Sequence, residues 1–123
     1  MVRISLSAVA LAAVTLASPA GAAMTTGTFV TRARALQAQG MTAVLSPDFQ
    51  TLRGEAQDAT QQLRADRAAR QAAGKKPIAC IPEGQSIGIL EMLDGLDALS
   101  PAEKKLPLKD GYAHVLAKRF PCR

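Results

Sequence analysis

The spacing of apolar and polar positions predicts a chain built from helices. In 25–40, apolar residues recur along one helical stripe, namely Phe29, Val30, Ala33 and Leu36. Gly40 is expected to end this helix, because glycine adopts the left-handed conformation of helix C-termini at little cost. A short apolar connector, 41–45, leads to the next element.

A longer helix is predicted over 48–73. Ser46 is a suitable cap, Pro47 suits the first helical position, and Gly74 suits the end. Apolar residues follow a 3-4-3-4 spacing along it, at Phe49, Leu52, Ala56, Ala59 and Leu63. This spacing places them on one face, which we expect to be packed against the core.

The same stripe turns polar after Leu63, so the last two or three turns of this helix are expected to project beyond the core. They carry a basic arm, which consists of Arg64, Arg67, Arg70, Lys75 and Lys76. One interpretation is a contact surface for an acidic partner, and the other is a solvated helix end without a role.

Three further segments complete the domain. The segment 75–84 contains two prolines that exclude a helix, and it is expected to be an extended crossing. Ser100 and Glu103 form the pattern of a capping box, which opens a short helical turn. The last helix is predicted over 108–120, with apolar residues on or near one face.

A third helix is predicted over 85–99, capped by Ser86. It is apolar nearly all round, which predicts a central position in the fold. Its charged residues form an acidic strip, Glu91, Asp94 and Asp97, which is the alternative candidate for a partner surface. Together these patterns predict a small all-α domain of four main helices and a short helical turn.

The N-terminus has the features of a secretory signal peptide. Arg3 supplies a positive charge, 4–17 is an uncharged, largely apolar run, and Ala20 and Ala22 are placed as in a cleavage site. The run is shorter than the roughly 20 residues that a membrane-spanning helix needs. We therefore expect a signal peptide at 1–22 and a single helical domain at 23–123, periplasmic or secreted, with no membrane contact after cleavage.

Export gives a role to the only two cysteines, Cys80 and Cys122. Disulfides persist outside the cytosol, and two cysteines allow one intramolecular pairing. The bridge would tie down the end of the chain and stabilise a small core. Two free thiols or an intermolecular bridge are the alternatives.

Composition and motifs argue against several classes of function. The chain has 15 Lys and Arg against 10 Asp and Glu, but only 3% aromatic residues, which is a poor match to nucleic-acid binding. His114 is the only histidine and is expected on a polar face, and the carboxylates of Glu91 and Asp94 are expected to be solvated. No nucleophile motif, phosphate loop or metal-ligand spacing is present, so we expect no enzyme, no metal and no cofactor.

The stretch CIPEGQSIGILEMLDGL, followed by PAEKKLPLKDGYAHVLAKRF and a terminal PC, resembles the C-terminal half of the Rap/Tai-type immunity proteins. These are small exported helical proteins of Gram-negative bacteria that neutralise type VI secretion effectors, notably peptidoglycan amidases. The similar part is about 77–122, in which Cys80 and Cys122 match as a structural pair. The N-terminal half is more similar to a group of exported alphaproteobacterial proteins of unassigned function.

The resemblance implies an exported protein-binding module, and in its most specific form an immunity protein that occludes a secreted effector enzyme. Its partner would be a protein. The alternative is a periplasmic stress or chaperone-like protein that exposes apolar surface conditionally.

Overall fold

The computed structural model describes residues 23–123, so the predicted signal peptide at 1–22 lies outside the described residues. The elements, in order, are α1 (Thr26–Ala38), the 3-10 helix η1 (Gly40–Leu45), α2 (Pro47–Ala72), α3 (Ile89–Asp97), α4 (Pro101–Lys104) and α5 (Leu108–Arg119). The described part has no strand, and the predicted all-α class is confirmed. Within this part, no helix combines the length and the apolar character that crossing a membrane requires.

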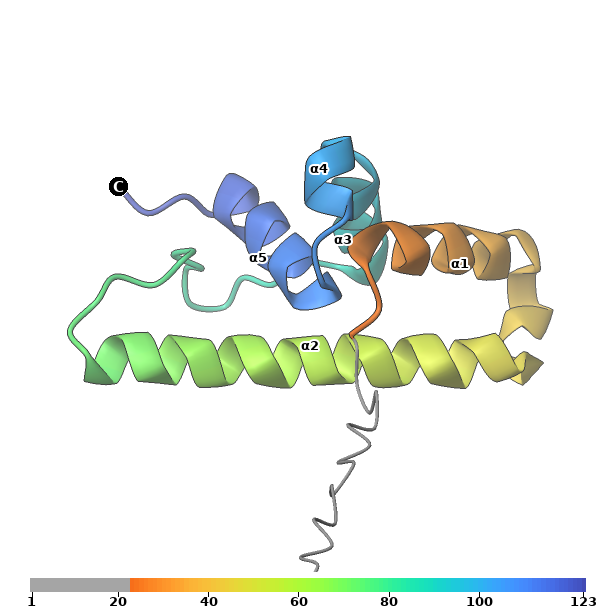
Figure 1. The fold of residues 1–123 in the computed structure, drawn as a ribbon, viewed down its shortest axis with the longest axis horizontal. Helices are drawn as coiled ribbons and strands as arrows, with labels where there is room; N and C mark the ends of the chain where they lie inside the picture. Colours follow the sequence, from red (N-terminus) through yellow and green to blue (C-terminus); the bar gives the residue numbers. More distant parts are fainter. Residues whose placement is uncertain (1–22) are drawn as a thin grey trace, which may run out of the picture.

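The helices form two layers. In Figure 1, α2 runs along one side of the molecule, and the shorter helices lie across from it. Both α1 and α5 pack on α2, while α3 packs on α1 and α5. The core between them is apolar, and its most completely buried members are Leu96 and Leu108. The predicted stripe of α2 takes part through Leu52 and Ala59, which are buried.

The turn between α1 and α2 follows from local sequence. Gly40 has a φ of 64°, which is the left-handed conformation that ends a helix. Ser46 caps α2 by accepting a hydrogen bond from the backbone N–H of Asp48 at 3.3 Å. Asp48 in turn pairs with the guanidinium of Arg32 on α1, and this interaction lowers the pKa of Asp48. Cap and ion pair together fix the two helices as a hairpin.

The third helix is shorter than the predicted 85–99. It begins at Ile89, because Gly88 is in the extended conformation and serves as the N-cap. Gly84, with a φ of 77°, turns the chain just before this point, and Ser86 does not cap the helix. The prediction of a central helix was also wrong in part. Leu96 is fully buried, but Ile89 is 87% exposed and Leu90 is 60% exposed.

A close approach between α1 and α5 holds the first residues that the structure describes. The backbone N–H of Thr26 donates to the carbonyl of Leu106 at 2.9 Å, and that of Leu108 donates to the carbonyl of Met24 at 3.0 Å. Thr26 is fully buried, and its hydroxyl donates to the Leu106 carbonyl at 3.0 Å. Gly111 of α5 faces this threonine so closely that a Cβ there would lie 2.4 Å from its Oγ1.

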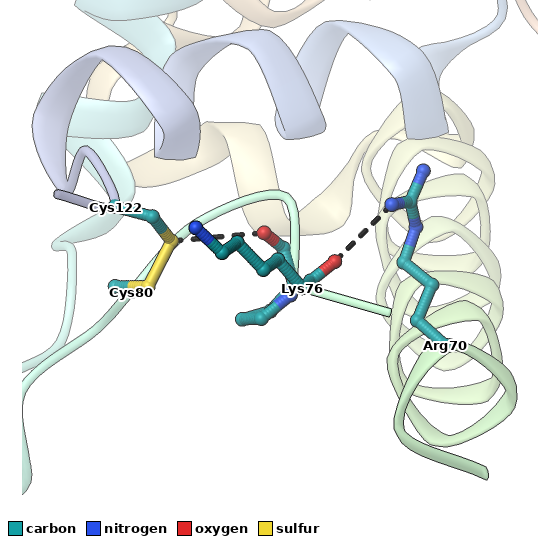
Figure 2. The surroundings of a disulfide bond; sticks show 5 residues. Arg70, Lys76, Cys80 and Cys122 are labelled. Atoms are coloured by element: carbon teal, nitrogen blue, oxygen red, sulfur yellow. Dashed lines mark hydrogen bonds between the residues drawn. A yellow bond between two sulfur atoms is a disulfide. The ribbon is translucent and has the colours of Figure 1, made fainter. Parts of the chain in front are cut away.

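The two cysteines form a disulfide bond, as predicted. Their Cα atoms are 5.0 Å apart and 42 residues apart in sequence. The backbone N–H of Cys80 also donates to the carbonyl of Phe120 at 2.9 Å. Figure 2 shows the bond joining the segment after α2 to the chain beyond α5. The extended segment 75–84 is thereby fixed against the end of the last helix.

Candidate functional site

The arginines of the basic arm continue the face of α2 that packs on the core. The α2 residues that face the interior are spaced by three or four positions, from Phe49 to Leu63, and the same spacing leads to Arg67 and Arg70, while Arg64 directly follows Leu63 and lies on the flank of this face. An α-helix repeats every 3.6 residues, so these side chains share one side of α2. The three arginines of the basic arm are therefore exposed side chains on or beside the face of α2 whose earlier turns pack on the core.

These arginines form one edge of a large open groove. The groove has a volume of about 1430 Å³ and lies between α2 and a wall formed by 77–90, α3 and α5, and residues of α1 and η1 also line it. Apolar side chains dominate the wall opposite the arginines, among them Ile78, Ile81, Ile87, Ile89, Leu90 and Met92. Arg53 adds a fourth guanidinium on α2, about 17 Å from Arg64 by the rise of a helix.

The charge of the groove is of one sign. Among residues 23–123, the side chains that line it include four arginines and neither aspartate nor glutamate. None of these four arginines forms an ion pair with a carboxylate in the part of the chain that the structure describes. Arg70 donates to the carbonyl of Lys76 at 3.2 Å, which is a contact to the backbone (Figure 2). The cationic edge is thus available to an acidic ligand.

As predicted, no residue of α2 beyond Leu63 is buried, so its last turns extend past the core, although they make two polar contacts. Asp66 pairs with Lys109 of α5 at 3.3 Å, and Arg70 is bonded to the segment after α2. These contacts hold the last turns beside α5, where they form part of the groove. Lys75 and Lys76, the other members of the basic arm, are exposed and are not among the residues that line the groove.

The acidic strip, the alternative candidate surface, already has partners within the chain. Glu91 accepts a hydrogen bond from a guanidinium at 2.7 Å, Asp94 does so at 2.7 Å, and Asp97 at 3.2 Å. The cations come from three other elements: Arg34 of α1, Lys104 of α4 and Arg119 of α5. The strip therefore connects helices, and its charge is largely balanced before any partner arrives.

His114 belongs to a small polar cluster outside the groove. Its Nδ1 lies 3.1 Å from a carboxylate oxygen of Glu103. Glu103 completes the predicted capping box with Ser100, and both hydrogen bonds of the box are present. Hydrogen bonding by the Ser100 backbone N–H lowers the pKa of Glu103. Glu103 is thus committed to capping α4, which is a structural role.

Tyr112 lies in the wall of the groove, and its environment can be measured directly. Its ring meets that of Phe29 edge-to-face with centroids 6.3 Å apart, and burial raises its pKa to about 12. Burial favours the neutral phenol over the phenolate. The stability that the buried Tyr112 side chain contributes is therefore fully present below about pH 10 and is lost as the pH rises through 12. We expect the absorbance of the folded protein to report phenolate formation near 12.

The chain has one tyrosine, so the signal is unambiguous. The same titration in urea should give the ordinary value near 10. A folded protein that titrates near 10 would show that the Tyr112 hydroxyl is solvated and that this part of the groove is more open than described.

Three residues of the groove were not predicted from the sequence, namely Arg53 and the exposed residues Ile89 and Leu90. The signal for the two apolar residues was present. A nine-residue helix that is apolar nearly all round can bury only one side against a single layer, so its other side must remain accessible. No group of three or more potential metal ligands gathers among residues 23–123.

Comparisons with protein-family models, curated proteins and solved structures gave no match to the chain. The resemblance of 77–122 to the Rap/Tai-type immunity proteins therefore stays a hypothesis from the sequence.

Proposed function

We propose that the chain is an exported module that binds another protein through the groove between α2 and the wall formed by 77–90, α3 and α5. One observation carries the proposal: a row of arginines without carboxylate partners borders an open apolar groove. Contiguous exposed apolar surface is uncommon on monomeric proteins and marks interaction sites. Arginine beside apolar anchors is also the composition enriched at the centres of protein interfaces.

The export of the module is part of the proposal. It rests on the signal-like pattern at 1–22 and on the disulfide, a bond typical of compartments outside the cytosol. The most specific form of the function is immunity, in which the module occludes the cleft of a secreted effector enzyme such as a peptidoglycan amidase. A domain crosslinked by a disulfide suits this role, because a rigid surface loses little conformational entropy on binding.

Affinity capture from periplasm tests the proposal when three baits are compared. The wild type should enrich a protein that Arg64→Glu/Arg67→Glu/Arg70→Glu does not retain, because reversing three charges turns attraction into repulsion. Lys75→Glu/Lys76→Glu/Lys105→Glu is the matched control, since it changes the net charge equally at exposed residues outside the groove. The recovered wild-type bait should begin at Ala23 or Met24 by mass spectrometry.

For the immunity form, the captured protein should be an enzyme whose activity falls to the baseline at a 1:1 ratio of module to enzyme. A partner retained equally by all three baits would contradict the assignment to the groove. An intact Met1 on the major soluble species would contradict export.

A chaperone-like protein is the second candidate, and the groove favours it too, because exposed apolar side chains can hold unfolded segments. Such binding would depend on apolar area rather than on charge and would resist salt. The module would then suppress aggregation of an unfolded client, and the arginine variant would do so as well as the wild type.

A further inference from the structure

We infer that the natural occupant of the groove is an amphipathic helix of the partner with an acidic edge, seated along α2. This inference rests on the proposed function and specifies the chemistry of the partner. Three observations lead to it: the extent of the cationic edge, the size of the groove, and the position of the exposed apolar side chains.

The arginines are spread out rather than convergent. From Arg53 to Arg70 the edge extends about 25 Å at the rise of an α-helix. A ligand with a single anionic head group could pair with only one end of this row. A helix lying along α2 can place a carboxylate near each arginine, because residues three and four apart share one face.

The size of the groove fits the same occupant. Pockets for small ligands have volumes of about 300–1,000 Å³, whereas this groove measures about 1430 Å³. Five turns of helix, roughly 27 Å long and 11 Å across and inserted to half their depth, displace on the order of 1300 Å³. The length of such a helix also matches the length of the row of arginines.

The exposed apolar side chains lie where the apolar face of such a helix would rest. Ile78, Ile89 and Leu90 are all exposed, and all three line the groove. They come from the wall that faces the arginines of α2. An occupant with one apolar face and an adjacent acidic edge would pack on the apolar wall and pair its carboxylates with the arginines of α2. This is the helix-in-groove mode of recognition.

The test uses designed peptides of about 18 residues, the length that spans the row of arginines. Each carries an apolar stripe of Leu, Met or Phe at i, i+3, i+4 and i+7, with Glu along one flank. A second set has Lys in place of Glu. Binding to the mature protein is measured by fluorescence anisotropy at about 0.05 and 0.5 M salt, conditions that differ strongly in screening.

We expect the acidic peptides to bind at least about tenfold more tightly than the basic peptides, with the preference shrinking at high salt. Arg64→Glu/Arg67→Glu/Arg70→Glu should remove most of that preference. Lys75→Glu/Lys76→Glu/Lys105→Glu should retain it. Circular dichroism and thermal unfolding of each variant establish that the fold is intact.

Palmitate and vesicles of phosphatidylglycerol are the competing probes. Binding of either one in the absence of peptide binding would overturn the inference in favour of a lipid ligand. Equal binding of acidic and basic peptides would contradict the inference that the occupant has an acidic edge. If no acidic peptide binds, the inference that the occupant is an amphipathic helix fails. A captured protein that still depends on the arginines would then leave the proposed function standing while this inference fails.

Discussion

Cys80→Ala or Cys122→Ala is expected to lower the free energy of unfolding by about 2–5 kcal/mol. The bond closes a loop between residues 42 apart in sequence, and in the chain-entropy model such a loop restricts the unfolded chain strongly. It also anchors the segment 77–90, which supplies one wall of the groove. Urea unfolding followed by circular dichroism measures the loss, and Tm should fall by at least about 10 °C.

The double variant provides the control for this prediction. Removing both cysteines should cost little more than removing either one, since each single change already eliminates the bond. Losses that add fully would mean that the two residues act separately. Thiol labelling of the denatured, unreduced wild type should find no free thiol.

Gly111→Ala is expected to destabilise the protein by about 1–3 kcal/mol, although alanine is the better helix former. The added Cβ would lie 2.4 Å from Oγ1 and 2.7 Å from Cγ2 of Thr26. Thr26 is fully buried and bonded to the Leu106 carbonyl, so it cannot move aside without losing that bond. Thermal and urea unfolding measure the change.

Gly54→Ala is the matched control, because it places the same methyl group in α2 with no atom within 4 Å. There the higher helix propensity acts alone and should stabilise the protein by about 0.5–1 kcal/mol. If Gly111→Ala gave the same gain as Gly54→Ala, the close packing of α1 against α5 would be disproved.

The helices that were predicted well are those whose signals are local. The stops at Gly40 and Gly74, the cap at Ser46 and the capping box at Ser100 each depend on a few neighbouring residues, and all four are present. The start of α3 was misplaced by four residues. Residues 85–88 have a helix-compatible pattern, but they form no regular secondary structure, and Gly88 is extended.

Only one part of the candidate site, the row of arginines, could be predicted from the sequence. The arginines of the basic arm stood out because they recur every three residues where the apolar stripe of α2 ends at Leu63. The groove itself depends on how 77–90 and α5 are placed relative to α2, and long-range packing of this kind has no local signature. The pairing of the acidic strip with Arg34 and Arg119 was likewise unpredictable, because those partners are 60 and 28 residues away from Asp94 and Glu91.

The contacts of α5 also determine when the domain can become complete. This helix packs on α1, α2 and α3, all of which precede it in the chain, whereas the hydrogen bonds of α2 close within α2 itself. A ribosome adds about 5–20 residues per second, so roughly 2–10 s separate the end of α2 from the end of α5. During that interval α5 does not yet cover the apolar stripe of α2, and the thiol of Cys80 has no partner cysteine. We therefore expect chaperones that bind exposed apolar segments to recognise the nascent chain until its last helix has been made.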